Sequence, residues 1–572
     1  MRRITYFIVF IVAFTNAQYP YKNPVVRTGY SSDPAPKVMP DGKVWMVTSI
    51  DHPDGGGYST MHSYRAFSSS DLVNWTDHGE ILNLNHQNEK PGEDWALWAP
   101  DIIYKHGKYY LYFPLRNIMA NGNHDSYVAV AVSDRMDTRF TILEHRMVGS
   151  EDGLDPAVFI DDDGEQYILW NRKSLSKLND DMKSIVGPVS KVAGTISQFM
   201  EAAWMHKRKG TYYYSYHTLY DKPVDINNPD NPSRKKSHLD YCMGNTITGT
   251  FTYKGTMNYE LGYGVKNGPK YPGKDYVVWR LNQSNHGGIV EYHGQDYLFY
   301  HNSALSSYKR SNFTNEGVWT QRSVCVDSLN YSSDGTIIPV KQTIECVAPV
   351  VVNQAFQIPL DVASATKTNV NVSGQKLSFT SNTATLRFDN LNLGSGYYYL
   401  DLKVNESVGN AKVQVRLDSP SGTLCGTIKL NFNSETVNNG KIETFLREAN
   451  GIHDVYLVFD LPGDYAQYDF ESPRFFAGSP VSIDINNGTK TNTLSDKLNI
   501  FPNPSNGQFS VDLSNVGEKS MIEIYSLQGT LVHSQLSEPA TVEISTKDWM
   551  PGIYFLNMKG SKSSIVEKFV LN

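Results

Sequence analysis

The sequence predicts an all-β protein with a five-bladed β-propeller, a jelly-roll β-sandwich and a small C-terminal β-sandwich. Three observations lead to this prediction. Short runs of aromatic and β-branched residues are frequent, Gly, Asn and Asp separate them, and one pattern occurs five times in the first half of the chain. Long apolar stretches with helical periodicity are hard to find. At 572 residues, the chain is long enough for about three or four domains.

The first 17 residues read as a signal peptide (1–17). MRRITYFIVFIVAFTNA has a basic start, an apolar centre and small residues before Gln18. Its apolar part is too short for a comfortable membrane span, and no other segment is a candidate. We therefore expect cleavage, export and no membrane-spanning segment in the mature protein.

Charge and cysteine content narrow the function classes. A net charge of −7 without a basic block argues against nucleic acid as a partner. Cys242, Cys325, Cys346 and Cys425 are too few for a disulfide scaffold, and their spacing is not that of a zinc site. A Cys325–Cys346 disulfide and buried free thiols both remain open.

The repeated pattern predicts where the functional site lies. Each copy has a leading polar residue, a short apolar segment, a Gly-containing turn and a second, mostly Tyr-rich segment, as in a β-hairpin. Copies at this spacing are typical of propeller blades, whose first strands line a central channel. The leading residues should then converge at one end of the channel, although each alone could merely pin its strand. They are Asp33, Asp101, Asp155, Glu201 and His286.

Converging carboxyl groups suit the hydrolysis of glycosidic bonds. One must be protonated to donate to the leaving oxygen, and another must be ionised to activate water. Glu201 lies in the apolar stretch FMEAAWMH, so we expect a raised pKa and the role of general acid. Asp33, in the polar stretch SSDPAP, is the expected general base. Asp155 would raise the pKa of Glu201 and orient it through like-charge proximity.

The residues from about Pro20 to Pro349 resemble glycoside hydrolase family 43, whose members are five-bladed propellers that act with inversion. The matching motifs follow the family order: DPAP (33–36), WAPD (98–101), LDPAVF (154–159), FMEAAW (199–204), NHGGIVEY (285–292), RSVCVDSL (322–329) and DGTI (334–337). Position by position, the resemblance implies that Asp33 is the general base, Glu201 the general acid and Asp155 the pKa-modulating carboxylate. Inversion implies a separation of roughly 6.5–9.5 Å between the carboxyl groups of Asp33 and Glu201.

Four residues near these motifs are candidates for substrate binding. Trp98 and Trp204 could offer aromatic faces to a sugar ring or belong to the blade core. Asp101 could bind a sugar hydroxyl or stabilise the start of its strand. Arg280 could reach a substrate hydroxyl or the Asp33 carboxylate, or it could be a solvated surface residue.

The chemistry requires no cofactor, but the resemblance raises the question of structural calcium. His286 matches the histidine near the propeller axis that in many members helps to hold Ca²⁺, often through water. A hydrogen-bonded axial histidine without metal is equally compatible with the sequence.

After about Pro349, alternating strands rich in Val, Thr, Asn and Ser predict a β-sandwich over residues 350–477. VRLDSPSGTLCGTIKL (415–430) and GIHDVYLVF (451–459) resemble family 6 carbohydrate-binding modules. VNQAF stands where the family has an acidic calcium ligand, and YDFESPRFF lacks the usual cleft asparagine, so its ligand residues stay unassigned. A sandwich that only stabilises the propeller is the alternative.

The last part of the chain predicts a linker and an export signal. Residues 478–497 are polar and rich in small residues, as in a linker. FPNPS, SLQGTLV, PGIYFL and KFVL, within residues 498–572, resemble the C-terminal sorting domain of the type IX secretion system. This resemblance implies contact with that machinery and a secreted or surface-attached protein. A small sandwich with a structural role is the alternative.

Taken together, residues 18–349 predict a secreted, monomeric, inverting glycosidase acting on plant cell-wall polysaccharide or its oligosaccharides. An α-L-arabinofuranosidase or β-xylosidase on arabinoxylan-type substrates is the leading hypothesis, and arabinan- or galactan-acting enzymes are alternatives. A retaining, fructan-cleaving propeller is disfavoured because Ser precedes Asp33 and Leu precedes Asp155. A non-catalytic glycan-binding protein would not need three differently placed acids.

Overall fold

The structure is a computed structural model of the chain. It describes residues 19–84, 95–118, 124–171, 173–219, 237–281, 284–352, 357–374, 376–404, 411–429, 441–463, 470–476, 498–505, 507–514, 519–526, 531–547, 549–559 and 564–571. The predicted signal peptide and the predicted linker lie outside these residues. The chain divides into two compact units, Met1–Val481 and Ser482–Asn572.

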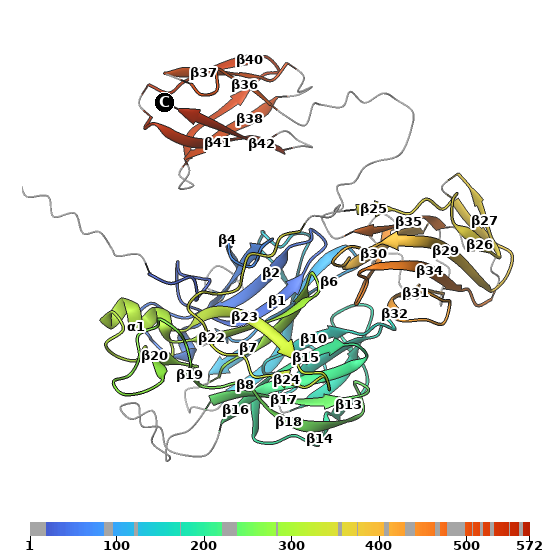
Figure 1. The fold of residues 1–572 in the computed structure, drawn as a ribbon, viewed down its shortest axis with the longest axis horizontal. Helices are drawn as coiled ribbons and strands as arrows, with labels where there is room; N and C mark the ends of the chain where they lie inside the picture. The colour runs from blue at the N-terminus through green and yellow to red at the C-terminus, as the bar shows by residue number, and fades with distance from the viewer. Residues whose placement is uncertain are drawn as a thin grey trace, which may run out of the picture. The chain divides into compact units, whose positions relative to one another are not determined.

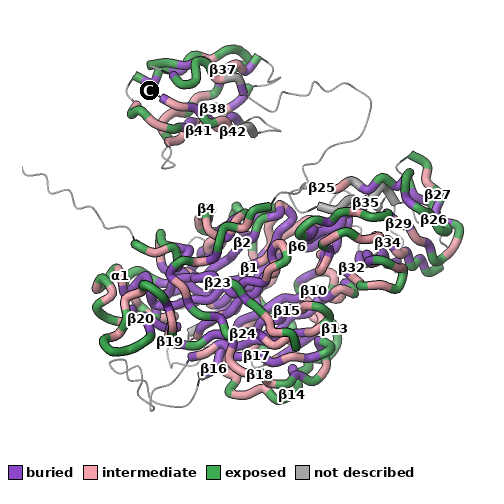
Figure 2. Tube along the Cα trace, viewed as in Figure 1, coloured by how far each residue is buried: buried purple, intermediate pink, exposed green. Residues whose placement is uncertain are grey.

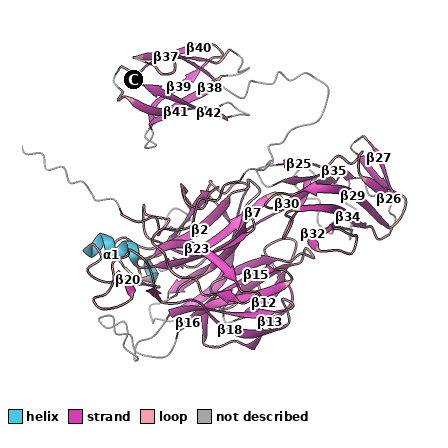
Figure 3. Ribbon diagram, viewed as in Figure 1, coloured by secondary structure: helices cyan, strands magenta, loops and turns pink. Residues whose placement is uncertain are grey.

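Nearly all regular structure is β-strand, as Figure 3 shows. Within the described residues, the only α-helix is α1 (Ala304–Ser311). No described helix has the length and apolar character needed to cross a membrane.

Five sheets, antiparallel except for the parallel pair of β14 and β18, follow one another along the first 340 residues and form the blades. The first sheet contains β1 (Ser31–Val38), β2 (Val44–Ile50), β3 (Ser63–Ser69) and β4 (Thr76–Asn83). The second sheet contains β5 (Trp95–Leu97), β6 (Asp101–Lys105), β7 (Lys108–Ile118), β8 (His124–Ser133) and β9 (Thr141–Glu144). The third sheet contains β10 (Ala157–Ile160), β11 (Gln166–Trp170), β12 (Ser174–Leu178) and β13 (Ile185–Lys191). The fourth contains β14 (Ala193–Thr195), β15 (Phe199–Arg208), β16 (Thr211–Leu219), β17 (Ser237–Gly244) and β18 (Thr250–Asn258); the fifth β21 (Gly288–Tyr292), β22 (Gln295–Asn302), β23 (Ser323–Tyr331) and β24 (Ile337–Ile338). A two-stranded ribbon, β19 (Leu261–Tyr263) and β20 (Tyr276–Arg280), precedes the fifth sheet.

The inner strands of the five blades close a ring. β1 contacts β6, β6 contacts β10, β10 contacts β15, β15 contacts β21, and β21 contacts β1. Figure 1 labels four of these strands, β1, β6, β10 and β15. This closed ring confirms the predicted five-bladed propeller. Each inner strand therefore has one end where its leading polar residue lies and another end where it turns into the second strand of its blade.

The turns of the inner hairpins explain why the repeated pattern carries glycine. His106–Gly107, Lys209–Gly210 and His293–Gly294 each link an inner strand to the next strand, and both residues of each pair have positive φ. Two consecutive residues with positive φ are typical of a type I′ turn, and Gly adopts this conformation without steric cost.

Apolar and tyrosine side chains fill the space between the blades, where Figure 2 shows mostly buried residues. Tyr112, Tyr214 and Tyr300 are among the largest fully buried side chains. All four cysteines are free thiols, so the Cys325–Cys346 disulfide that the sequence left open is not formed.

Two further sheets form the predicted sandwich. One contains β25 (Gln357–Pro359), β27 (Val370–Ser373), β28 (Lys376–Phe379), β30 (Tyr399–Val404), β33 (Lys441–Phe445) and β35 (Phe470–Phe476). The other contains β26 (Thr366–Thr368), β29 (Thr383–Asn392), β31 (Lys412–Leu417), β32 (Leu424–Lys429) and β34 (Ile452–Asp460). The last propeller strand and the first sandwich strand lie on either side of the predicted boundary at residues 349 and 350.

The sandwich packs on the turns of the inner hairpins. Glu443 accepts a hydrogen bond of 2.6 Å from the backbone N–H of His106, and Arg447 pairs with Asp162 at 2.9 Å. Tyr398 accepts a bond of 2.5 Å from the backbone N–H of His293. The sandwich therefore covers the end of the propeller away from the leading polar residues.

The C-terminal unit is a separate small β-sandwich. One sheet contains β36 (Asn499–Phe501), β37 (Gln508–Asp512) and β40 (Thr541–Ser545); the other contains β38 (Ser520–Ser526), β39 (Leu531–Ser537), β41 (Gly552–Lys559) and β42 (Ser564–Leu571). Side chains from both sheets, including Phe509, Ile522 and Phe569, form its core.

Candidate active site

The structure brings four of the five leading polar residues together at the open end of the inner strands. Asp33 lies in β1 and Glu201 in β15, while Asp155 and His286 lie two residues before the starts of β10 and β21. His286 Nδ1 is 3.1 Å from Asp33 Oδ1, and His286 Nε2 is 3.5 Å from Asp155 Oδ2. Asp155 Oδ2 also accepts a bond of 3.0 Å from the backbone N–H of Ala202, the residue after Glu201.

The backbone around these side chains is unusual. Asp33, Asp155, Ala202 and Ser284 have φ values of 53°, 48°, 60° and 61°, in the left-handed region. For residues other than glycine this conformation costs roughly 1–2 kcal/mol each. The pairing register also shifts beside Asp33 in β1 and beside Glu201 in β15. Such bulges redirect side chains, and here they flank the two residues expected to act as base and acid.

Asp33 is a buried carboxylate held by two cationic side chains. It is 2% exposed, and Arg322 Nη1 lies 2.9 Å from its Oδ1. Burial alone would raise the pKa of Asp33, but Arg322 and then His286 outweigh burial and hold this pKa well below its usual range. These two cations therefore favour the ionised form of Asp33.

Arg322 is a site residue that the sequence analysis missed. Its Nε and Nη2 donate to the Asp51 carboxylate at 2.9 and 2.8 Å, and its backbone N–H donates to the same group at 2.8 Å. Arg322 is 1% exposed, and Asp33 and Asp51 together neutralise it. The available signal was its place as the first residue of the RSVCVDSL motif.

The surroundings of Glu201 differ from the expectation. His217 lies opposite Glu201 in the β15–β16 pairing, with Nδ1 3.6 Å from Oε1. Burial raises the pKa of Glu201, but His217, Ser284 and His286 together outweigh burial and bring this pKa below its ordinary value. The expected raised pKa was inferred from the Met, Ala and Trp residues of the FMEAAWMH stretch. Because neighbouring residues of a strand point to opposite faces, side chains of other strands surround the carboxyl group instead.

The carboxyl group whose pKa is raised is that of Asp155. Burial is the main cause, and the charges of Glu201 and Asp33 act in the same direction against His286. The site thus contains one firmly ionised carboxylate, Asp33, and an interacting pair of carboxyl groups, Asp155 and Glu201.

His286 fits a cationic bridge between carboxylates better than a direct metal ligand. Burial lowers its pKa, but Asp155 and Asp33 outweigh burial and raise this pKa well above its usual value. An imidazolium has no lone pair for a metal. Among the described residues, no group of three or more His, Cys, Asp or Glu side chains is placed to hold a metal ion. Ca²⁺ prefers oxygen ligands, so contact of His286 with calcium through water remains the prediction.

Trp98 lies beside the site within a group of aromatic residues. Its Nε1 donates a bond of 2.9 Å to the backbone carbonyl of Tyr58, and the two rings are 5.9 Å apart. The Tyr58 ring also lies 6.4 Å from that of Trp319, which is 50% exposed. The guanidinium of Arg322 is 5.3 Å from the Tyr58 ring, so these aromatic residues border the acids. A sugar contact of Trp98 stays a prediction.

Asp101 and Trp204 do not belong to this group. Asp101 is fully buried; it accepts bonds of 2.7 Å from the backbone N–H groups of Ile102 and Val158 and pairs with Lys37 at 3.1 Å. Asp101 thus stabilises the start of its strand, and the sugar-binding alternative is not supported. Trp204 is 7% exposed, lies under the Lys37 ammonium at 4.1 Å, and lines a cavity toward the sandwich. The structure therefore does not bring Trp204 to the four leading residues.

Arg280 also lies elsewhere. It ends β20, is 7% exposed, and pairs with Glu260 at 3.4 Å and with Glu316. It is neither a surface residue nor the partner of Asp33. Arg322, not Arg280, contacts the Asp33 carboxylate.

Three family models match the chain. Residues 21–220 match glycosyl hydrolases family 43, residues 356–476 match the carbohydrate binding module of family 6, and residues 499–572 match a secretion system C-terminal sorting domain. The sorting domain marks the protein for secretion and attachment at the cell surface.

Several characterised proteins are similar to this chain. A xylosidase/arabinosidase of Bacteroides ovatus is 30% identical over 370 residues, which cover 56% of this chain and 98% of that protein. An arabinoxylan arabinofuranohydrolase of Paenibacillus polymyxa is 26% identical over 490 residues, which cover 76% of this chain and 71% of that protein. The solved structure of a β-xylosidase/α-arabinofuranosidase from a compost microbial metagenome has 29% sequence identity and a TM-score of 0.43. The match covers 56% of this chain and 97% of that chain. With its five-bladed ring and its matched relatives, the chain belongs to glycosyl hydrolase family 43 and is a glycosidase.

Proposed function

We propose that this extracellular glycosidase removes α-L-arabinofuranosyl or β-D-xylosyl units from arabinoxylan-type polysaccharide or its oligosaccharides, with inversion. The observation that carries the proposal is the arrangement of Asp33 and Asp155 around His286, with Glu201 interacting with Asp155 and with Asp33 held ionised by Arg322. The names of the similar proteins, arabinoxylan arabinofuranohydrolase and xylosidase/arabinosidase, support the substrate class.

Asp33 is the proposed general base. Its charge is stabilised by Arg322 and His286, so it is ready to accept a proton from a water molecule. As the water attacks the anomeric carbon, the bond from that carbon to the leaving oxygen breaks. Attack from the face opposite the leaving group inverts the configuration.

Glu201 is the proposed general acid, with Asp155 as its positioning partner. The leaving oxygen needs a proton from an acid on the other side of the sugar ring. Asp155 and Glu201 interact, so they titrate as a pair, and one proton on this pair at working pH is sufficient. A sugar that displaces water from Glu201 raises its pKa and moves this proton toward the leaving group.

The test compares wild type and Glu201→Gln on nitrophenyl α-L-arabinofuranoside and nitrophenyl β-D-xyloside. We expect activity of wild type on at least one substrate and a loss of about 10²–10⁴ in kcat/KM for the variant. The loss should be smaller with dinitrophenol, because this better leaving group needs less protonation. Glu443→Gln, which changes a buried carboxyl group at the sandwich interface, should retain activity.

Two outcomes would contradict parts of the proposal. If wild type and Glu201→Gln are equally inert on a panel of plant and algal glycans, the protein is a glycan-binding protein rather than an enzyme of this class. Proton NMR of the first-formed anomer tests inversion, and a retained anomer would contradict the role of Asp33 as the base.

We also propose that the protein acts as a monomer and that any calcium contacts His286 only through water. One chain closes the ring and supplies all the acids, which supports the monomer. Light scattering checks the mass of the assembly. Titration of calcium into wild type and His286→Asn by calorimetry tests whether His286 contributes to a calcium site. The same binding heat for both proteins would exclude His286 from that site.

A further inference from the structure

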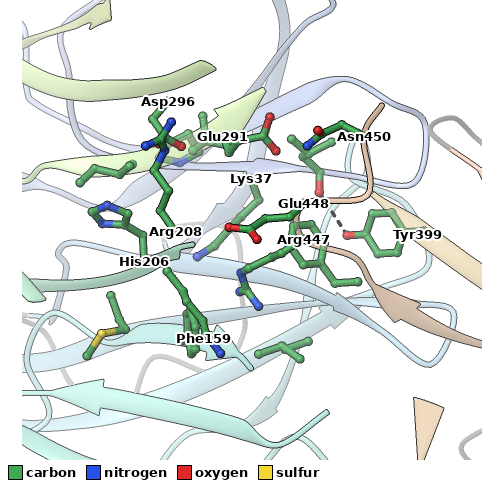
Figure 4. A pocket seen from close by; sticks show the side chains of 18 of the residues that line it. Lys37, Phe159, His206, Arg208, Glu291, Asp296, Tyr399, Arg447, Glu448 and Asn450 are labelled. Atoms are coloured by element: carbon green, nitrogen blue, oxygen red, sulfur yellow. Dashed lines mark hydrogen bonds and ion pairs between the residues drawn. The ribbon is translucent and has the colours of Figure 1, made fainter. Parts of the chain in front are cut away.

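A cavity of about 390 Å³ lies between the propeller and the sandwich, as Figure 4 shows. This volume is in the range of small-molecule sites, about 300–1,000 Å³. Lys37 and Trp204 line it, four residues after Asp33 and three residues after Glu201 on the same inner strands. At about 3.3 Å per residue, the cavity is roughly 10 Å or more from the acids, toward the opposite end of the channel.

We propose that this cavity is a second ligand site, which binds a neutral mono- or disaccharide between the propeller and the sandwich. The proposal rests on its walls, on the pairing of its charges and on the polar side chains that converge in it. It does not depend on the proposed catalytic activity.

Aromatic residues from both domains form the walls. Trp204 and Phe159 come from the propeller, and Tyr399 and Phe445 come from the sandwich. The Arg447 guanidinium lies 4.5 Å from the Phe159 ring and 5.2 Å from the Phe445 ring. Aromatic faces with a few polar groups between them suit a sugar, whose C–H faces are apolar and whose edges carry hydroxyl groups.

Three of the cations at the cavity already have carboxylate partners. Lys37 pairs with Asp101 at 3.1 Å, Arg447 with Asp162 at 2.9 Å and Arg208 with Asp296 at 3.0 Å. An ionic ligand would have to compete with these pairs, whereas hydroxyl groups only add hydrogen bonds to them. The ion pairs engage Nη1 of Arg447 and Nε of Arg208, and a guanidinium has further N–H donors for hydroxyl oxygens. These features favour a neutral ligand.

Polar groups point toward the centre of the cavity. In Figure 4, the side chains of Lys37, Arg447 and Glu448 converge there. His206 also lines the cavity and is 8% exposed; its Nε2 is 3.0 Å from the Tyr331 hydroxyl, and its Nδ1 has no hydrogen-bond partner among the described residues. Because this nitrogen is itself inaccessible, the hydrogen bonds to ligand hydroxyl groups would come from the converging side chains.

The test uses two exposed residues that line the cavity on different sandwich loops, Asn450 and Thr423. Asn450→Trp and Thr423→Trp should block the cavity, while Asn450→Ala and Thr423→Ser are matched controls. Xylobiose, arabinose and glucuronic acid are titrated into the full-length chain by calorimetry, in a Glu201→Gln background that prevents turnover. We expect a neutral sugar to show a binding event that the tryptophan variants weaken about tenfold or more and the controls leave within about twofold.

The possible outcomes separate this proposal from the proposed function. Binding of neutral sugars that no tryptophan variant alters would overturn it, and so would binding of glucuronic acid alone. Without the Glu201 substitution, the tryptophan variants should retain wild-type kcat/KM on a nitrophenyl glycoside. If wild type is inactive on every glycoside but binds a neutral sugar, and the tryptophan variants weaken this binding, the proposed activity fails and the second site stands.

Discussion

At the scale of single residues, Arg322 controls the charge of the proposed base. Its guanidinium contacts both Asp33 and Asp51, and all three side chains are nearly inaccessible to solvent. Two buried carboxylates next to each other would repel, so the arginine is what allows Asp33 to remain ionised inside the protein.

The variant Arg322→Met should therefore raise the pKa of Asp33. The general base must be ionised, so the acid limb of the kcat/KM profile should move to higher pH, by about one pH unit or more. The pH–rate profile on a nitrophenyl glycoside measures this shift. Arg322→Lys keeps a positive charge and should give a smaller shift.

Arg280→Met is the matched control for this variant. Arg280 is also a buried arginine with two acidic partners, Glu260 and Glu316, but it does not contact Asp33. Both methionine variants should lose stability, by about 3–5 kcal/mol, because each leaves buried carboxylates unpaired. Only Arg322→Met should move the acid limb; an unchanged limb in a folded Arg322→Met protein would contradict the assignment.

At the scale of strands, the β15–β16 pairing places His217 opposite Glu201. His217 is fully buried, and neither of its ring nitrogens has a hydrogen-bond partner among the described residues. It is the strongest of the neighbouring groups that lower the pKa of Glu201 against the effect of burial.

His217→Asn should consequently raise the pKa of Glu201. The general acid must be protonated, so the basic limb of the kcat/KM profile should move to higher pH, by about one pH unit. His238→Asn, on the next strand of the same blade, is the control and should leave this limb in place. If neither variant moves the basic limb of the kcat/KM profile, the titration of Glu201 does not produce that limb.

The strands also show what the sequence could predict. The five hairpins and the convergence of Asp33, Asp155, Glu201 and His286 follow from local patterns, the alternation of apolar residues and the Gly turns. Arg322 reaches Asp33 across 289 positions in sequence, and His217 reaches Glu201 through a bulged register. Such contacts depend on ring closure and register, which no local pattern encodes. The pKa of Glu201 was wrongly predicted for the same reason.

At the scale of the whole molecule, the contacts of the sandwich with the propeller include a titratable group. Glu291 lies near the end of β21; its Oε1 accepts a bond of 2.5 Å from the backbone N–H of Gly294 and one of 3.3 Å from the hydroxyl of Tyr398 in the sandwich. Burial raises the pKa of Glu291 from 4.5 to about 7, and the nearby charge of Asp296 adds to this effect while Arg208 opposes it.

This raised pKa makes the stability of the first unit depend on pH. The folded protein holds the Glu291 proton more tightly than the unfolded chain does, so its contribution to the free energy of unfolding is complete below about pH 4.5. The contribution is lost as the pH rises through about 7. Glu291→Gln keeps a neutral side chain at every pH. Relative to wild type, it should therefore raise the free energy of unfolding at pH 8, by about 1–3 kcal/mol, and have little effect at pH 4.5.

Urea unfolding of both proteins at several pH values between 4.5 and 8 measures this difference. Glu538→Gln, at an exposed position of the C-terminal unit, is the control and should match wild type throughout. The sign of the effect is decisive because Asp296 and every other titrating group are common to wild type and variant. An increase at pH 8 shows that ionised Glu291 weakens the contact between propeller and sandwich. A decrease at pH 8 would mean that its charge stabilises that contact, contrary to the burial of the group.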